Sequence, residues 1–263
     1  MRLSLPRRRK PTAWAGVCRP GWSETSGLSD FLWFSGWQGD LESTYQAMLD
    51  RRSEFSLVAE PGTTFRYSNG GYGLLSLVLE AALGQPIHSI MSSRVFQPAG
   101  MIDATMEQAP DRSVTGWYNG PVLIDRLAAG YNGSPPEIRT AYSLMYTIPG
   151  AGGAIGTADD LAHFARAVFR NRLLPEELIA KMLAPDPAVH ERYADGWIVG
   201  ERNGHARYSH SGGTNGFLSL LEYYPNLDLT IVILSNLGFA DIGGLSSSVA
   251  DIALQLATEM EAR

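Results

Sequence analysis

Apolar residues recur at a spacing of three or four along much of the chain, which is the pattern of amphipathic helices. One helix is predicted to start near Gly71 and to end at Gly84 and Pro86, two residues that stop helices. Its apolar positions are Leu74, Leu75, Val78, Leu79 and Ala82. These side chains predict a helix with one face in the core.

Short N-terminal signals mark further helices. They stand before apolar stripes at Asp40, Pro86, Thr157 and Pro175. Asp160 follows Thr157 at the third position, which completes a capping box. A last helix is predicted over residues 242–261.

The final third of the chain changes to short runs typical of strands. These runs are Arg207–His210, Phe217–Tyr224 and Leu229–Ser235, separated by turns that contain Gly or Asn. The third run is apolar without alternation, so we expect it to be buried on both faces. Residues 106–150 are rich in Gly, Pro, Tyr and Asn and predict loops with short strands. The whole order predicts an α+β fold.

Composition narrows the class of protein. The chain has 263 residues, 44% hydrophobic and 18% charged, which suits a folded core and excludes disorder as the main state. Cys18 is the one cysteine and cannot form an internal disulfide. No apolar run has the length of a membrane helix, and no Cys/His cluster has zinc-ligand spacing. We therefore expect no metal, no cofactor and no membrane span.

Charge is unevenly distributed along the chain. Residues 1–22 carry +6, whereas the remainder carries −12, for a net charge of −6. Because the remainder is acidic, its composition does not indicate a basic surface that would bind nucleic acid. We interpret residues 1–22 as a disordered basic tail, because a signal peptide would need an apolar segment that is missing here. Residues 23–263 then form one domain. For the chain as printed we expect a cytoplasmic location; a longer relative with a signal peptide would be periplasmic or secreted.

The tripeptide Tyr67-Ser68-Asn69 is the first candidate site. In an extended segment the side chains of Tyr67 and Asn69 point the same way. A phenol can shuttle protons if a nearby cation lowers its pKa, and a carboxamide can hold a substrate carbonyl and a catalytic group together. The alternative is an ordinary turn.

Two glycine-containing segments are further candidates. In His210-Ser211-Gly212-Gly213 the glycines would let a substrate backbone lie along a strand, and a free N–H could stabilise an oxyanion. A β-turn after the strand is the alternative. The Gly-rich run over residues 150–161 resembles a phosphate cradle, but no Lys follows it. Tight packing of this loop against the core is the better interpretation.

Together these motifs resemble the serine β-lactamase-like hydrolases, which include class C β-lactamases, D-alanyl-D-alanine carboxypeptidases and family VIII esterases. The resemblance rests on six segments in the family's order: Thr25-Ser-Gly-Leu, residues 61–69, Pro98-Ala-Gly-Met, residues 152–161, Gly196-Trp and His210-Ser-Gly-Gly. It implies the catalytic residues Tyr67, Asn69 and His210, with His210 where many members have lysine. It also implies that Ser211, Gly212 and Gly213 bind substrate, and that Gly213 offers an oxyanion-hole N–H.

The resemblance implies a β-lactamase/transpeptidase-like fold, with an antiparallel sheet, flanking helices and a mostly helical lobe. Tyr67 and His210 would meet in the cleft between lobe and sheet. Members also carry two N-terminal strands beside the last strand of the sheet, and we expect these strands to be missing here. Leu229–Ser235 then becomes an apolar sheet edge, which predicts self-association.

The family's nucleophile is the serine of Ser-x-x-Lys, and no serine stands three residues before either lysine, Lys10 or Lys181. We therefore expect the nucleophile to be absent from this chain, which as given would be inactive. The function that the resemblance implies is a serine hydrolase acting on esters, amides or D-amino-acid peptides through an acyl-enzyme. In this interpretation the sequence is an incomplete record of that enzyme. The alternatives are a homologue or gene fragment with a binding role or no activity, and β-lactam hydrolysis.

Overall fold

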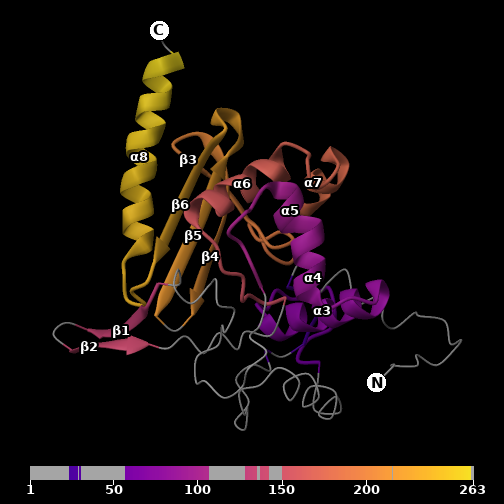
Figure 1. The fold of residues 1–263 in the computed structure, drawn as a ribbon. Coiled ribbons are helices and arrows are strands. Elements are labelled where there is room, and N and C mark those ends of the chain that lie inside the picture. The colour runs from indigo at the N-terminus through magenta and orange to yellow at the C-terminus, as the bar shows by residue number, and fades with distance from the viewer. Residues whose placement is uncertain are drawn as a thin grey trace, which may run out of the picture. The chain divides into compact units, whose positions relative to one another are not determined.

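The computed structural model describes residues 24–28, 30, 57–106, 128–134, 137–141, 150–214 and 216–261. The basic segment 1–22 and the helix predicted after Asp40 lie outside these residues. The chain divides into two compact units. The first comprises residues 1–90, 146–153 and 182–196, and the second comprises residues 91–145, 154–181 and 197–263. Each unit is described by itself (Figure 1).

Helix α3 (Asn69–Leu83) is the main described helix of the first unit. Its N-cap is Ser68, whose side chain accepts a hydrogen bond from the backbone N–H of Gly71 at 3.0 Å. Gly84 ends the helix in the left-handed conformation, with φ +65°, and donates its N–H to the carbonyl of Glu80. The predicted stop is confirmed, and the helix begins two residues before the predicted start.

A second helical run follows Pro86 and changes its hydrogen-bond pattern midway. It consists of α4 (Ile87–Met91), the π-helical segment η2 (Ser92–Phe96) and α5 (Gln97–Ala99). Within η2 the backbone N–H of Gln97 donates to the carbonyl of Ser92, five residues earlier. The run confirms the helix start predicted at Pro86.

Four antiparallel strands make up the sheet of the second unit, in the order β3-β4-β5-β6. They are β3 (Ile198–Arg202), β4 (His205–Thr214), β5 (Phe217–Tyr224) and β6 (Leu229–Ser235). The bounds of β5 and β6 agree with the sequence prediction. Strand β4 is longer at both ends than predicted, and β3 was not predicted.

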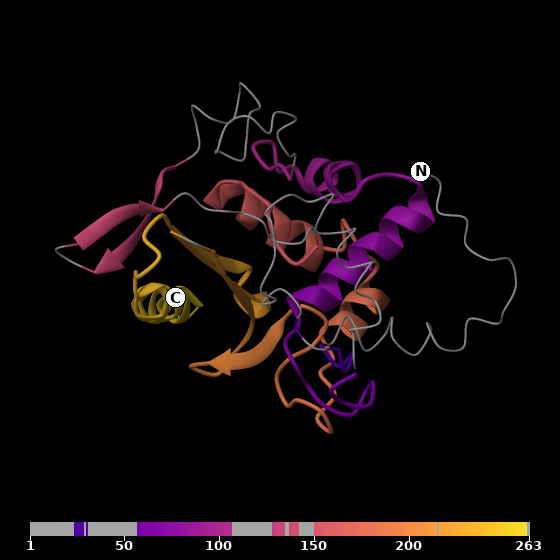
Figure 2. The same ribbon diagram turned by 90° about the horizontal axis from the view of Figure 1, so that it is seen from below.

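The expectation that β6 is buried on both faces is wrong. Ile231 is buried, but Leu234 is 43% exposed, and the other residues of the strand are partly exposed. The reason is its place in the sheet, because β6 is an edge strand among the described residues. One face of the sheet packs against helix α8 (Ile242–Glu261), as Figures 1 and 2 both show. This contact buries Tyr224, Ile231, Ala250 and Leu254.

Two further helices of the second unit match their predicted caps. Helix α6 (Ala158–Phe169) begins after Thr157, and Thr157 and Asp160 form the complete capping box. Helix α7 (Glu176–Met182) follows Pro175. A separate apolar cluster joins α6 to the end of the π-containing run; its buried members are Phe96, Ala99, Met101, Met106 and Ala167.

A short hairpin lies within the region predicted to hold loops and short strands. Strands β1 (Gly130–Ser134) and β2 (Glu137–Ala141) pair antiparallel. Tyr131 forms a parallel bridge to Leu237, just after β6. The hairpin is therefore attached beyond the end of the sheet strand β6, as Figure 2 also shows.

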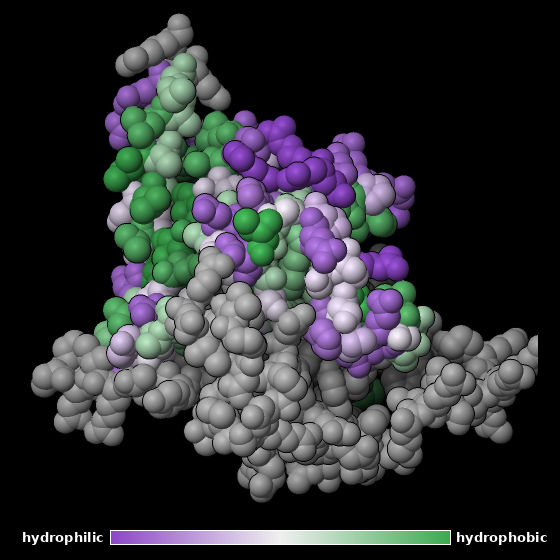
Figure 3. Space-filling model, viewed as in Figure 1, coloured by the Kyte–Doolittle hydropathy of each residue, from purple (hydrophilic) through white to green (hydrophobic). Residues whose placement is uncertain are grey.

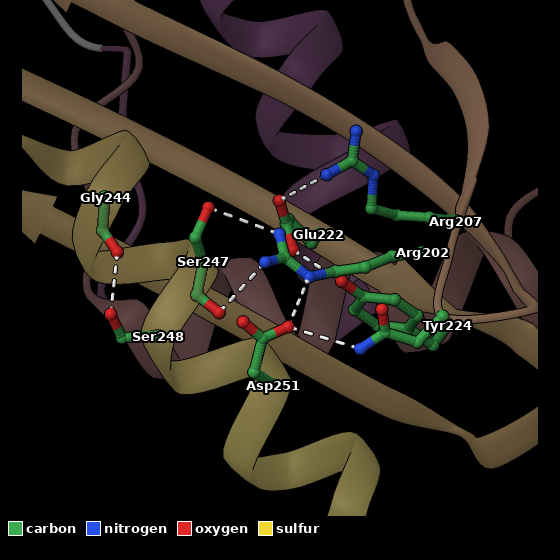
Figure 4. A network of polar contacts seen from close by, with 9 residues as sticks. Arg202, Arg207, Glu222, Tyr224, Gly244, Ser247, Ser248 and Asp251 are labelled. Carbon is green, nitrogen blue, oxygen red and sulfur yellow. Dashed lines mark hydrogen bonds and ion pairs between the residues drawn. The ribbon is translucent and has the colours of Figure 1, made fainter.

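A polar network fastens α8 to the sheet (Figure 4). Arg202, at the end of β3, bonds Asp251 at 3.0 Å and the carbonyl of Ser247 at 3.1 Å. Beside it Arg207 pairs with the buried Glu222 at 3.1 Å, and the hydroxyl of Tyr224 donates to the same carboxylate at 2.8 Å. The hydrogen bonds of Arg202 fix how α8 is oriented on the sheet, whereas the rest of this contact is apolar.

The outer side of α8 presents an apolar stripe to solvent (Figure 3). Its residues and exposed fractions are Leu245 53%, Val249 40%, Ile252 62%, Leu256 54% and Met260 77%. Their spacing of three or four places them on one face of the helix. Among the described residues, no single helix has the length and hydropathy of a membrane span. The bent pair of α3 with residues 87–99 passes that test by length and composition only.

Candidate active site

The tripeptide Tyr67-Ser68-Asn69 forms the start of α3. Ser68 is fully buried as the N-cap, Asn69 is half-buried, and Tyr67 is 48% exposed. The buried position thus alternates with two more accessible ones, as expected for an extended entry into a helix. The structure brings a phenol and a carboxamide to the same helix terminus.

Glu24 holds the backbone on both sides of Tyr67. Its carboxylate accepts a hydrogen bond from the N–H of Ser68 at 2.8 Å, and its carbonyl accepts one from the N–H of Arg66, also at 2.8 Å. The Glu24 residue is 1% exposed. Burial raises the pKa of Glu24 to about 8, a change that the hydrogen bond from Ser68 opposes and the charge of Asp30 reinforces.

Asp30 fixes the amide of Asn69. The Nδ2 of Asn69 donates to Asp30 Oδ2 at 3.1 Å, and the backbone N–H of Gly70 donates to Asp30 Oδ1 at 3.3 Å. A carboxylate only accepts, so the amide nitrogen of Asn69 must face Asp30. The Oδ1 of Asn69 is then turned away from Asp30, as an acceptor.

The charged groups that act on Tyr67 are acids, whereas a role as a proton shuttle would need a nearby cation that lowers its pKa. Instead burial raises the pKa of Tyr67, and the charges of Glu24 and Asp30 raise it further. Its phenol is therefore protonated at neutral pH and can donate a hydrogen bond.

Two further tyrosines extend this cluster, and the sequence analysis missed both. The ring of Tyr193 meets Tyr67 edge-on at a centroid distance of 6.3 Å. Burial is the main cause that raises the pKa of Tyr72 and of Tyr193, whose hydroxyls share a hydrogen bond. Neither residue lies in a motif that identified the site, so no sequence signal marked them.

His190 also belongs to this cluster. Its ring is tilted by 45° against that of Phe65, with the centroids 4.4 Å apart, and its Nδ1 accepts a hydrogen bond from the backbone N–H of Tyr193 at 2.8 Å. The ring thus orders the loop that carries Tyr193.

The serines inside the first motifs have structural roles. Ser26 is 2% exposed and its hydroxyl accepts the N–H of Leu28 at 3.3 Å. Ser68 is fully buried as the cap of α3. Both hydroxyls are withdrawn from solvent, so neither is presented as a nucleophile.

The His210 segment lies within strand β4, so the β-turn alternative is wrong. His210, Ser211, Gly212 and Gly213 pair with Leu221, Leu220, Ser219 and Leu218 of β5. Ser211, Gly212 and Gly213 are exposed. A Cβ at Gly212 would lie 2.6 Å from Ser219 Oγ of β5, so a side chain there would displace that hydroxyl.

His210 is held as a neutral ring. Its Nδ1 lies 2.7 Å from the carbonyl oxygen of Ser211, and because a carbonyl only accepts, Nδ1 carries the proton. Burial lowers the pKa of His210, and the bond to Ser211 opposes this change in part. In the neutral ring Nε2 is then the acceptor.

The Gly-rich loop begins in contact with α3. Gly150 has φ +97°, and a Cβ there would lie 2.7 Å from Ser76 Cβ and 2.8 Å from the carbonyl oxygen of Tyr72. Glycine is therefore required for close packing. This confirms the interpretation of tight packing over that of a phosphate cradle.

The predicted site residues fall into two groups. Tyr67 and Asn69 belong to the first unit, whereas His210, Ser211, Gly212 and Gly213 belong to the second. That Tyr67 and His210 meet around a substrate stays a prediction. Within the described part of the chain, no group of three His, Cys, Asp or Glu side chains could hold a metal ion.

Comparison with known proteins gives the family. The profile of the family described as Beta-lactamase matches residues 23–244. The chain is similar to Penicillin-binding protein 4* of Bacillus subtilis (strain 168), with 26% identity over 81% of this chain and 50% of that protein. It is also similar to Esterase EstB of Burkholderia gladioli, with 28% identity over 74% of this chain and 55% of that protein.

Solved structures agree on the fold. The D-amino acid amidase of Ochrobactrum anthropi SV3, complexed with L-phenylalanine amide, superposes with a TM-score of 0.65. The match covers 83% of this chain and 63% of the amidase, with 23% identity. The chain therefore belongs to the Beta-lactamase family and has the β-lactamase/transpeptidase-like α+β fold. It spans about half the length of the curated relatives it matches.

Proposed function

We propose that this chain carries the proton-donating and substrate-positioning groups of an acyl hydrolase acting on small esters, amides or D-amino-acid peptides. The observation that carries the proposal is the start of α3, where Tyr67 and Asn69 flank the buried cap Ser68. The similarity to an esterase and to a D-amino acid amidase supports this substrate range.

Each group has a role in the proposed reaction. The protonated phenol of Tyr67 donates its proton to the departing alcohol or amine. Asn69 positions the substrate, and Gly213 offers its N–H to the developing oxyanion. Ser211 and Gly212 align the substrate along β4, beside the neutral ring of His210.

The proposal assigns no nucleophile to this chain. In the family reaction a serine oxygen attacks the substrate carbonyl, the leaving group departs with a proton, and water releases the acyl group. The 263 residues contain no Ser-x-x-Lys, and Ser26 and Ser68 are buried. We propose that the 263 residues alone bind substrate without turning it over.

Two alternatives stand beside this proposal. One is a binding role or no activity, which the withdrawn serines favour. The other is β-lactam hydrolysis, which the penicillin-binding relative keeps open. The neutral His210, where many members have lysine, favours the esterase and D-peptidase branches over efficient lactam turnover.

The test combines covalent labelling with binding. The 263-residue chain is incubated with a fluorophosphonate and with benzylpenicillin and its mass is measured, while thermal shift reports binding of a p-nitrophenyl ester, D-phenylalanine amide and a chromogenic cephalosporin. We expect no adduct, and stabilisation by the ester or amide that Asn69→Ala abolishes. A serine adduct would overturn the missing nucleophile, and the absence of all binding would overturn the substrate-positioning role.

We also propose that the chain self-associates through β6. Its residues Leu229–Ser235 include no charge and no proline, the features that usually protect an edge strand. The apolar stripe of α8 lies in the same unit. We expect analytical ultracentrifugation to show oligomers that Leu234→Lys reduces. The control Leu178→Lys, at a residue similarly exposed on α7, should leave them; a monodisperse monomer would contradict the proposal.

A further inference from the structure

We propose that Glu24 and Asp30 are the positioning residues of the Tyr67–Asn69 pair, with Glu24 setting the backbone around Tyr67 and Asp30 setting the amide of Asn69. This inference rests on the proposed function for the importance of Tyr67 and Asn69. Its geometry does not depend on turnover. Both acids come from the short segment around Thr25-Ser26-Gly27, which the family resemblance marks but to which it gives no chemical role.

Glu24 acts on Tyr67 from both neighbours in the chain. In an extended segment the N–H groups of residues i−1 and i+1 point to the same side, and here both are taken by Glu24, one by its carbonyl and one by its carboxylate. Glu24 keeps φ at +57°, a conformation that costs energy for a residue with a side chain. The bonds to Arg66 and Ser68 offset this cost.

Asp30 acts on the other member of the pair. Its two oxygens are divided between the side chain of Asn69 and the backbone of Gly70, at 3.1 and 3.3 Å. The carboxylate also stands at the N-terminus of α3, where the helix dipole favours negative charge. One acid therefore both supports the helix start and fixes which way the amide of Asn69 faces.

The charge state of Glu24 affects the pKa of Tyr67. The groups that face Glu24 are Asp30, Tyr67, Tyr72 and Tyr193, which are all acids or phenols. Burial raises the pKa of Glu24 to about 8, so the carboxyl is mostly protonated at pH 7. A protonated Glu24 can still accept the N–H of Ser68, and it places no negative charge beside Tyr67, where such a charge would raise the pKa of the phenol further.

The test compares Glu24→Gln, which keeps an oxygen acceptor and cannot ionise, with Glu24→Ala, which removes the acceptor. Amide hydrogen exchange of the peptide covering residues 66–68 reports the backbone clamp. We expect exchange to accelerate in Glu24→Ala and to stay slow in Glu24→Gln. The matched control is Glu60→Gln, which changes an exposed glutamate of the same unit. Equal exchange in Glu24→Ala and wild type would overturn the clamp.

The electrostatic part has its own readout. The phenol of Tyr67 is titrated by ultraviolet absorbance, as the difference between each protein and the same protein carrying Tyr67→Phe. Above pH 8, where Glu24 is ionised in the wild type, we expect the midpoint of Tyr67 in Glu24→Gln to move to lower pH. An unchanged midpoint would overturn the coupling. Neither readout needs hydrolysis, so loss of the proposed function and loss of this inference are distinguishable.

Asp30 is tested by the nuclear magnetic resonance signals of the Asn69 side-chain amide. Asp30→Ala removes its acceptor, and we expect the two Nδ2 protons of Asn69 to shift upfield and to exchange faster with solvent. Asp103→Ala, at a half-buried aspartate outside the cluster, is the control and should leave these signals in place. If the Asn69 amide signals are the same in Asp30→Ala and wild type, Asp30 does not position the amide.

Discussion

The Nδ1 of His210 donates a hydrogen bond to the carbonyl oxygen of its neighbour Ser211 at 2.7 Å. This bond stays within β4 and fixes the tautomer of the ring, since a carbonyl can only accept. The imidazole therefore stands on the candidate substrate strand as a neutral group. Charge on His210 works against the folded state, because burial disfavours the imidazolium.

This arrangement predicts how stability depends on pH. Because the pKa of His210 is lowered on folding, the unfolded chain binds more protons just below pH 6.5. The contribution of His210 to the free energy of unfolding is therefore present above pH 6.5 and is lost as pH falls through the folded-state pKa. In His210→Gln we expect this loss to be absent in urea unfolding between pH 5 and 8.

The control for this series is His205→Gln on the same strand, which accounts for the removal of a histidine as such. Parallel curves for wild type and His210→Gln across the whole range would show that His210 ionises equally in the folded and unfolded chain.

Substitutions at Gly150 and Gly62 allow the cost of steric overlap to be distinguished from the cost of backbone strain. Both have positive φ, but a Cβ at Gly150 would meet Ser76 and Tyr72, whereas a Cβ at Gly62 meets nothing within 4 Å. We expect Gly62→Ala to lower the free energy of unfolding by about 1 kcal/mol through strain alone. Gly150→Ala should lower it by about 3 kcal/mol, since overlap adds to strain. Urea unfolding measures both, and equal losses would contradict the packing of this loop.

The ion pair between Arg207 and Glu222 should contribute more to the free energy of unfolding than an exposed ion pair does. Glu222 is 4% exposed at its side chain, so removing Arg207 leaves a buried carboxylate with the hydroxyl of Tyr224 as its remaining side-chain partner among the described residues. We expect Arg207→Met to lower the free energy of unfolding by roughly 2–3 kcal/mol, at or below the usual range for a buried pair because Arg207 is 25% exposed.

The comparison for Arg207 is Lys181→Met, which breaks an exposed pair with Glu177 at spacing i, i+4. Such pairs contribute about 0.3–0.5 kcal/mol. Chemical denaturation measures the free energy of unfolding of both variants. If Arg207→Met lowers it no more than Lys181→Met does, the ion pair of Arg207 in the network of Figure 4 adds no more stability than an exposed pair.

The cap of α3 gives a fourth prediction. Ser68→Ala removes the oxygen that accepts the N–H of Gly71 and leaves that donor buried. We expect a loss of about 1–2 kcal/mol in the free energy of unfolding, because cap residues contribute this much. Ser248→Ala, at an exposed serine of α8, should change stability little. A thermal unfolding temperature equal to that of the wild type in Ser68→Ala would contradict the capping role.

Local signals in the sequence were enough to predict much of the fold. Gly84 and Thr157 mark helix ends through backbone geometry that the residue type itself determines. The strands Phe217–Tyr224 and Leu229–Ser235 are bounded by turns in the same way. The burial of β6 was mispredicted because an apolar run does not reveal whether another strand covers its edge.

The candidate site was predictable only where motif residues carry the chemistry. Tyr67 and Asn69 stand in a recognisable tripeptide. Glu24 and Tyr193 do not, because their roles depend on contacts across 44 and more than one hundred residues of chain. The raised pKa of Tyr67 follows from the same distant acids, so no local pattern could indicate its direction.

The π-helical segment Ser92–Phe96 precedes Pro98, whose ring nitrogen cannot donate to the helix. A π-turn accommodates one residue more than an α-turn while the helix continues on both sides. The segment is therefore a point where the chain can change length. Removing one residue from it should restore ordinary helical winding and leave Ile90 and Ala99 on the faces they now occupy. Among related proteins of different length, this turn is where we expect a single-residue gap to be tolerated.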